Sequence, residues 1–384
     1  MTMRVIHTAD VHLDLSYAGA GFGPALASQR RQSVRDVLRL ILQRARVWPA
    51  DAVLIAGDLF ELDRVSSDTI AFLQSEFRAI APIRVFIAPG NHDPYMPHSP
   101  YALEQWPENV TIFSKPMWSR VQLDTVPLTI HGFAFDGYDI SRNPFSELKA
   151  PDDGRVHIAI AHGSERGNIP DKKQAYAPFR ADEIAQEGLA YLALGHYHAY
   201  TQIAESPTTI CYSGAPEGHD FSETGMRHYL EIEIENGIAT VAAIPSSRTL
   251  YVEHTIDCTS FTNTSELVDA IRAIQGDISF PRLARITLTG LCLPAIRNEL
   301  IAVQDIAGGL FQYLQLIDDT TPLDDYSDLE SETTTLGEFI RRISAEIADT
   351  TDPDRKRMLE RAREVGLASC RGQQLAINGI ERSA

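Results

Sequence analysis

The sequence predicts a layered α/β domain, followed by a small α+β unit and a pair of C-terminal helices. Through the first 200 residues, apolar β-branched runs alternate with stretches that repeat at helical spacing, a pattern typical of layered α/β domains. Near residue 251 the pattern changes to a shorter mixture of helices and strands, and two amphipathic stripes close the chain. We therefore expect domains at residues 1–250, 251–325 and 326–384.

Five apolar runs in the first domain are interpreted as strands. They are "MRVIHTAD" (3–10), "DAVLIAGD" (51–58), "IRVFIAPGNHD" (83–93), "VHIAIAHG" (156–163) and "YLALGHYH" (191–198). Their apolarity is continuous rather than alternating, which indicates strands that are buried on both faces.

Helical patterns separate the first three runs. The first has an apolar face of Val34, Val37, Leu38, Ile41, Leu42 and Ala45, with Arg31, Arg35 and Arg39 on another face that we expect to be solvated. The second repeats Ile70, Leu73, Phe77 and Ile80 after a start signal at Ser66. Strand–helix–strand alternation indicates layers of helices against a sheet.

The second half of the chain predicts a compact α+β unit and then helices. Residues 264–274 read as a helix, 282–290 as a strand, and 298–318 as a helix followed by a strand. An acidic run from 318 to 332 is expected to be a solvated linker. Two apolar stripes follow, Leu336, Phe339, Ile340, Ile343 and Ile347, then Met358, Leu359, Ala362 and Val365. Such a stripe either folds back or docks on a partner.

Composition limits the class of protein. Hydrophobic residues make up 44% and charged residues 22%, as in ordinary globular proteins. No apolar run is long enough to cross a membrane, the N-terminus does not resemble a secretory signal, and the four cysteines are scattered. We expect a cytoplasmic protein with reduced thiols. The formal charge of −18 argues against bulk electrostatic binding of nucleic acid, although bound cations or local basic patches reverse the field where they lie.

All five apolar runs end in polar, metal-capable residues. The set is Asp10, His12, Asp58, Asn91, His162, His196 and His198. Functional residues of α/β sheets gather beyond the carboxyl ends of the strands, so we expect these seven at one rim. Taken alone, Asp-x-His and Gly-Asp after a strand are more typical of a turn or a surface histidine, "GHYH" is also typical of surface histidines, and "GNHD" is more specific. Five of them in succession predict a shared site.

The ligand types indicate which metals fit. The set offers imidazole, carboxylate and amide oxygen without sulfur, which suits manganese, iron, zinc or a similar divalent ion. Seven ligands are too many for one ion and are typical of two ions that share a carboxylate. Such a pair activates a water and stabilises both oxygens of a phosphoryl displacement.

These motifs resemble the calcineurin-like metallophosphoesterase superfamily, and within it the SbcD-type DNA repair exonucleases with their YhaO-like branch. The similar stretches are "HTADVHLD", "VLIAGDLFELD", "VFIAPGNHDPY", "IAIAHGS", "YLALGHYHAY" and "YSGAPEGHDFSETG". The resemblance is strong over residues 3–250 and looser over 251–325. It implies a metallophosphoesterase β-sandwich flanked by helices, with a small capping domain.

The resemblance also implies roles for individual residues. One metal would be bound by Asp10, His12, Asp58 and His198, and the other by Asp58, Asn91, His162 and His196, with Asp58 as the bridge. Manganese(II) is the expected ion, with Mg, Fe or Zn as alternatives. His92 would reach the scissile phosphate, and Asp93 would either orient His92 or cap the turn. Where archaeal and eukaryotic relatives have a histidine after "GDLF", this chain has Glu61.

The function implied is 3′→5′ exonuclease activity with some endonuclease activity on DNA, in an SbcCD-like complex with a coiled-coil SbcC-type ATPase. Relatives that act as dimers imply a homodimer as well. A small-molecule phosphodiesterase or phosphatase on the same scaffold is the alternative, since fold does not fix function. A scaffold without chemistry would lack a ligand, and all seven are present.

Overall fold

The computed structural model describes residues 2–18, 21–168, 174–184, 188–274, 280–323 and 326–370. The described residues form two compact units. The first unit comprises the described residues up to Val252 and a short later segment that ends at Leu283. The second unit comprises the described residues that begin at Glu253, without that short segment, and those that begin at Ala284. The division of the second unit into a cap and a C-terminal part stays a prediction.

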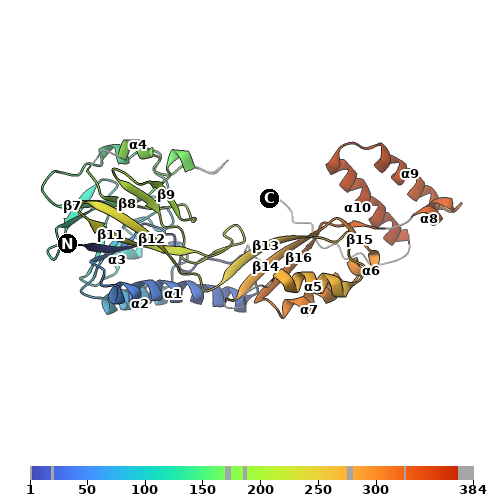
Figure 1. Cartoon of the computed structure of the whole chain (residues 1–384), viewed down its shortest axis with the longest axis horizontal. Coiled ribbons are helices and arrows are strands. Elements are labelled where there is room, and N and C mark those ends of the chain that lie inside the picture. Colours follow the sequence, from blue (N-terminus) through green and yellow to red (C-terminus); the bar gives the residue numbers. More distant parts are fainter. Residues whose placement is uncertain are drawn as a thin grey trace. The chain divides into compact units, whose positions relative to one another are not determined.

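The first unit contains two six-stranded sheets (Figure 1). In the first sheet the order is β12-β11-β1-β2-β3-β4. Its parallel part is β1 (Met3–Thr8), β2 (Ala52–Ile55), β3 (Arg84–Ile87) and β4 (Val110–Ile112). The antiparallel strands β11 (His228–Glu235) and β12 (Ile238–Pro245) extend the sheet beside β1.

The second sheet has the order β5-β6-β7-β8-β10-β9. Strands β6 (Leu128–Gly132), β7 (Val156–His162), β8 (Tyr191–Gly195) and β10 (Thr209–Tyr212) are parallel. The edge strands β5 (Ser119–Gln122) and β9 (Thr201–Ala204) are antiparallel to their neighbours. The short helices α3 (Pro100–Leu103) and α4 (Ala181–Ile184) lie in connecting segments.

The two sheets pack face to face around one apolar core. Val5, Leu54 and Phe86 of the first sheet belong to the same buried cluster as Ile160 and Ala193 of the second. The five runs predicted as strands are therefore divided, three in one sheet and two in the other. The predicted layered α/β fold, a β-sandwich flanked by helices, is confirmed.

Helices α1 (Pro24–Val47) and α2 (Ser67–Ala79) cover the outer face of the first sheet (Figure 1). The Ser66 hydroxyl accepts a hydrogen bond from the backbone N–H of Thr69 and caps α2, as its start signal predicts. Arg35 and Arg39, expected on a solvated face, pair with carboxylates of α2, Arg35 with Asp68 and Arg39 with Glu76.

The second unit contains a three-stranded sheet with the order β13-β14-β16. Its strands are β13 (Leu250–Asp257), whose first residues belong to the first unit, β14 (Arg282–Thr289) and β16 (Tyr313–Asp318). Helices α5 (Thr264–Ile274) and α7 (Leu300–Gly308) lie on one face of it (Figure 1). The segments β15 (Leu291–Cys292) and β17 (Thr321–Pro322) pair in parallel, and α6 (Pro294–Arg297) follows β15.

The acidic run is not a plain solvated linker, which corrects the expectation. It contains β17 and the short helix α8 (Ser327–Ser331), and Asp318 pairs with Arg297. Tyr326 is buried against the C-terminal helices, so apolar packing orders part of this segment. Asp324 and Asp325 lie outside the described residues.

The C-terminal helices α9 (Thr335–Asp349) and α10 (Pro353–Cys370) pack against each other. Ile340, Ile343 and Ile347 of the predicted α9 stripe are buried. The residues of the second predicted stripe lie on α10 and are not buried, because Met358 is 70% exposed and Val365 is 39% exposed. No helix among the described residues has both the length and the apolarity needed to span a membrane.

Candidate metal centre

The seven predicted ligands follow the carboxyl ends of strands from both sheets. Asp10 and His12 follow β1, Asp58 follows β2, Asn91 follows β3, His162 ends β7, and His196 and His198 follow β8. The site therefore lies where the ends of two packed sheets meet. It does not lie on the rim of one open sheet.

Four of these residues adopt a left-handed backbone. The φ angles are 52° at Asp10, 49° at His12, 52° at Asp58 and 114° at His196. Residues other than glycine rarely adopt this conformation unless the surrounding structure enforces it, and such strain gathers at functional sites. Here the backbone N–H of His12 donates to the Asp58 carbonyl at 2.9 Å, which locks the two loops together.

Two glycines allow this close approach. A Cβ at Gly57 would collide with the His162 ring, and a Cβ at Gly90 would collide with the Asp58 carboxylate. Gly57 also has φ 88°, which favours glycine. The glycines beside the motifs therefore make room for the side chains of neighbouring strands.

Asp58 lies between two imidazoles. Its Oδ2 is 3.3 Å from Nε2 of His162 and 3.8 Å from Nε2 of His12. Its Oδ1 accepts a hydrogen bond from the backbone N–H of His92 at 2.9 Å. Burial alone would raise the pKa of Asp58, but His162 and His12 outweigh it and lower the pKa well below its usual value. A charged carboxylate between two ligand groups is the arrangement that a bridging ligand needs.

The rings of His12 and His162 are held by contacts of Nδ1, so Nε2 is the nitrogen that is left to bind a metal. Nδ1 of His162 lies 3.0 Å from the Ala56 carbonyl, and Nδ1 of His12 lies 2.7 Å from Glu61. Carbonyl and carboxylate oxygens only accept, so each Nδ1 donates, and in the neutral form that binds a metal the lone pair is on Nε2. Nε2 of His12 is buried without a hydrogen-bond partner among the described groups. This orphaned nitrogen fits a metal ligand, because a buried polar atom is otherwise costly to leave unpaired.

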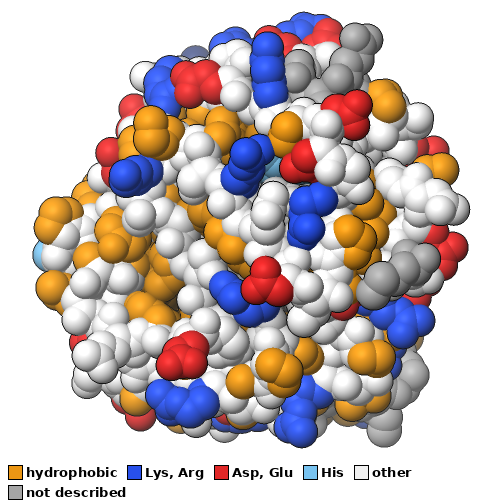
Figure 2. All heavy atoms as spheres, turned by 90° about the vertical axis from the view of Figure 1, so that its left-hand side faces the viewer, with side chains coloured by type: hydrophobic (Ala, Val, Ile, Leu, Met, Phe, Trp, Pro, Cys, Tyr) orange, Lys and Arg blue, Asp and Glu red, His pale blue; other side chains and the backbone are white. Residues whose placement is uncertain are grey.

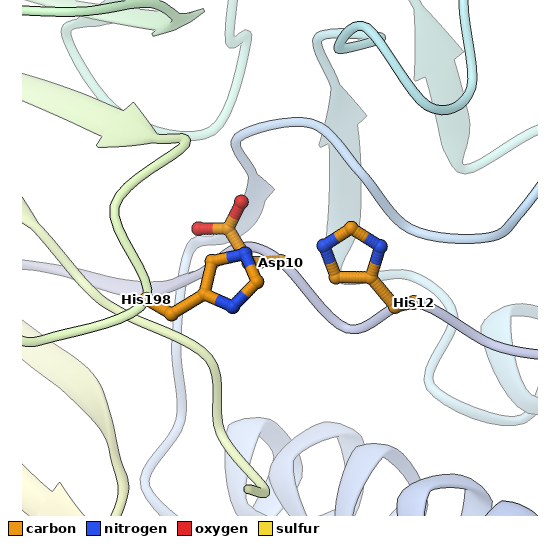
Figure 3. A group of neighbouring side chains, drawn as sticks. All are labelled: Asp10, His12 and His198. Carbon is orange, nitrogen blue, oxygen red and sulfur yellow. The ribbon is translucent and has the colours of Figure 1, made fainter. Parts of the chain in front are cut away.

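The ligand atoms gather in two overlapping groups. Asp10, His12 and His198 form one, and Asp10, Asp58 and His162 form the other, each with its atoms within 4.8 Å of one another. Figure 3 shows the Asp10 carboxylate and the rings of His12 and His198 around a common space.

Asn91 and His196 lie beside the second group. Oδ1 of Asn91 is 3.1 Å from Nε2 of His162. The His196 ring lies 5.1 Å from the His162 ring, between centroids, and its backbone N–H donates to Asp10 at 3.0 Å. Burial and His162 lower the pKa of His196 to about 3, so the ring is neutral, as a metal ligand must be. Of the predicted ligands with imidazole or carboxylate groups, His196 alone is absent from the 4.8 Å groups of described residues.

His92 faces solvent at the edge of this cluster. Its side chain is 45% exposed, and its Nδ1 lies 3.1 Å from Oε2 of Glu61. The hydrogen bond to Glu61 raises the pKa of His92 to about 9 against the opposing effect of burial. Burial would raise the pKa of Glu61, but hydrogen bonds from His12 and His92 lower it to about 2. Glu61 thus joins a predicted ligand to the predicted proton donor.

Asp93 does not orient His92, which corrects one of the two readings of this residue. Its carboxylate accepts hydrogen bonds from the backbone N–H groups of Asp58, Leu59 and Gly90 and from the Tyr101 hydroxyl. The carboxylate that meets His92 is Glu61. Asp93 is fully buried and holds two ligand-bearing loops together, in agreement with the turn-capping alternative.

Sequence reasoning missed two residues near the site, His219 and Glu223. Both lie in the "EGHDFSETG" stretch, which carried a resemblance but no assigned role. Oε1 of Glu223 lies 2.5 Å from Nδ1 of His198, and the His219 ring lies 5.1 Å from the His12 ring. A histidine and a glutamate four residues apart beside a glycine would have been the available signal.

The sequence profile of the calcineurin-like phosphoesterase family matches residues 3–200. The chain belongs to this family. Its described residues include candidate ligands for two metal ions, as the family name metallophosphoesterase implies.

Similar proteins extend the comparison. The chain is 26% identical over 275 residues to the uncharacterized metallophosphoesterase YhaO of Bacillus subtilis, covering 70% of this chain and 66% of that protein. It is 26% identical over 245 residues to the DNA double-strand break repair protein Mre11 of Methanopyrus kandleri, covering 58% of this chain and 50% of that protein. The matches thus span between half and just under two thirds of these relatives.

Solved structures with lower similarity include a dimetal phosphatase from Danio rerio. It is 11% identical with a TM-score of 0.42, covering 64% of this chain and 96% of that one. A Vps29 double mutant from Entamoeba histolytica is 10% identical with a TM-score of 0.28, covering 63% of this chain and 99% of that one.

Proposed function

We propose that this metallophosphoesterase hydrolyses DNA phosphodiesters as the 3′→5′ exonuclease and endonuclease subunit of an SbcCD-like repair complex. The observation that carries the proposal is the 26% identity over 245 residues to a protein named for DNA double-strand break repair. The metal-ligand groups lie in the segments that follow the strands of both sheets, and His92 lies in the segment after β3.

Two divalent ions, with manganese(II) as the proposed native metal, would be held by the seven predicted ligands. Asp10, His12, Asp58 and His198 would bind one ion, and Asp58, Asn91, His162 and His196 the other. When bound, such a pair polarises a phosphoryl group and lowers the pKa of a water. Asp58 would keep the pair together, since its carboxylate lies between the His12 and His162 nitrogens.

His92 would donate the proton that the leaving oxygen needs. Glu61 holds Nδ1 of His92, so Nε2 is the nitrogen left to meet substrate. With a pKa of about 9, the ring is protonated at neutral pH. As the bond from phosphorus to the leaving oxygen breaks, the Nε2 proton passes to that oxygen and His92 becomes neutral.

Charge favours a second candidate, a small-molecule phosphodiesterase or phosphatase. The formal charge is −18, and the face drawn in Figure 2 intersperses basic and acidic side chains without gathering the basic ones. Proteins that bind DNA mainly through phosphates need clustered positive charge. A small substrate needs only the metal centre and His92.

Cleavage assays distinguish the two candidates. We expect manganese-dependent release of nucleotides from the 3′ ends of linear duplex DNA, followed with labels at the 3′ or the 5′ end in parallel. Asp58→Ala should abolish the release. The same loss excludes contaminating nucleases, and Glu233→Gln, at a half-exposed carboxylate on β11, should keep the activity and so controls for unspecific effects of a substitution. Cleavage of a chromogenic phosphodiester without any cleavage of DNA would replace the first candidate by the second.

We propose an SbcC-type coiled-coil ATPase as partner, bound through residues 333–370. The support is the exposed apolar surface of α10, where Met358 is 70% exposed. Deleting 333–370 should abolish co-purification with the ATPase and leave metal binding intact. Met358→Lys should weaken association, whereas Met117→Lys, at a methionine of the first unit that is 54% exposed, should not. Undiminished binding by the truncated chain would place the docking surface elsewhere.

A further inference from the structure

A partly buried cluster of two histidines and a glutamate lies beside the metal centre. One nitrogen or oxygen atom each from His198, His219 and Glu223 lies within 4.8 Å of the others. His219 is 5% exposed and Glu223 is 9% exposed. Of the three, only His198 belongs to the predicted ligands, so Glu223 and His219 need another explanation.

Both carboxylate oxygens of Glu223 are used as acceptors. Oε1 lies 2.5 Å from Nδ1 of His198, and Oε2 accepts the backbone N–H of His219 at 3.0 Å. Since a carboxylate only accepts, His198 donates from Nδ1, and the neutral ring that a metal needs then carries its lone pair on Nε2. Figure 3 shows one ring nitrogen of His198 turned toward the Asp10 carboxylate. The contact with Glu223 therefore selects the tautomer and ring orientation that a metal ligand requires.

Hydrogen bonds with Tyr251 hold the loop that carries Glu223. The Tyr251 hydroxyl donates to the His219 carbonyl at 2.9 Å, and the backbone N–H of Gly225 donates to the Tyr251 carbonyl at 3.1 Å. Tyr251 is buried and lies against the guanidinium of Arg30, which is 5.4 Å from the ring centroid. Glu223 is thus presented to His198 by a rigid turn and not by a free side chain.

We propose that Glu223 is a positioning residue of the metal centre, which holds the His198 ring with Nε2 toward the metal. The inference rests on the metal centre given under Proposed function. Carboxylates behind metal-binding histidines typically change metal affinity by about 10–100-fold when removed. Glu61 makes the matching contact with Nδ1 of His12, another predicted ligand.

The test is an equilibrium titration of the metal-stripped full chain with Mn(II), followed by electron paramagnetic resonance. Wild type should bind two ions. Glu223→Gln should bind one of them roughly 10–100-fold more weakly, because an amide has one acceptor oxygen where Glu223 uses two. Its melting temperature and circular dichroism should stay close to wild type. Asp220→Asn is the matched control, since Asp220 lies in the same loop but accepts hydrogen bonds from Ser222 and is exposed.

The outcomes separate this inference from the proposed function. If Glu223→Gln binds both ions like wild type, or if Asp220→Asn loses as much affinity, the positioning role is overturned. If wild type binds no ion, the metal centre itself is wrong. Should Glu223→Gln fail to fold, ¹⁵N spectra of histidine-labelled, Zn(II)-loaded wild type decide the matter. An Nδ1–H proton on His198 supports the inference, and an Nε2–H proton overturns it.

Discussion

Oε2 of Glu61 lies 3.1 Å from Nδ1 of His92. This contact raises the pKa of His92 to about 9, and a proton donor works only while it is protonated. Activity should therefore fall as pH rises through about 9. In Glu61→Gln the supporting charge is gone, so this alkaline limb should move to lower pH, and the rate should fall by about 10–100-fold. A pH–rate profile with an unmoved alkaline limb would contradict the role of Glu61.

Removing His92 itself should separate catalysis from metal binding. His92→Ala should keep both metals and the fold, because its exposed ring is not among the predicted ligands. General acid catalysis contributes about 10²–10⁴-fold, and turnover should fall by that amount. The measurement pairs kcat with elemental analysis. If kcat falls by less than about fivefold while both metals stay bound, the loss is too small for general acid catalysis. That result would exclude His92 as the proton donor.

Asp58→Ala should lose metal and activity together. Asp58 lies between the His12 and His162 nitrogens, so without it two cations would face each other with no shared anion to offset their repulsion. Metal content by elemental analysis should drop in parallel with hydrolysis. Two ions still bound at full occupancy would show that Asp58 is not the bridge.

Asp93 should matter for stability before it matters for chemistry. It accepts three backbone N–H groups and the Tyr101 hydroxyl. In Asp93→Asn the amide N–H groups face donors, which should cost about 1–3 kcal/mol of unfolding free energy. Tyr101→Phe removes a single hydrogen bond and should cost about 1 kcal/mol. Urea denaturation measures both, and an unchanged midpoint for Asp93→Asn would refute the structural role.

His7 should make stability depend on pH. Burial lowers the pKa of His7 from 6.5 to about 3, so below 6.5 the unfolded chain binds a proton that the folded chain excludes. Stability should then fall as pH drops from about 6.5 toward 3, by up to about 1.4 kcal/mol per pH unit.

His7→Asn keeps a partner for the Tyr191 hydroxyl, which lies 2.8 Å from Nδ1, and should flatten this slope in denaturation curves. His98→Gln, at an exposed histidine, should leave the slope as in wild type. Equal slopes in wild type and His7→Asn would mean that another group governs acid unfolding.

What the sequence by itself determined is local. Apolar runs such as 156–163 marked strands, Ser66 marked a helix start, and the polar residues after each strand identified the candidate ligands. These features depend on neighbours a few positions away, so periodicity and residue type carry them.

Only the tertiary structure decided which distant groups meet. It divided the five strands between two sheets. It paired Nδ1 of His92 with Glu61 and not with Asp93, and it brought Glu223 into contact with Nδ1 of His198. Asp93 is the sequence neighbour of His92, yet its side chain turns to the backbone of the loop after β2. Such contacts follow from how two twisted sheets pack and from the left-handed turns after β1 and β2. No spacing along the chain encodes these distances, because the residues come together only when the shared core between the sheets forms.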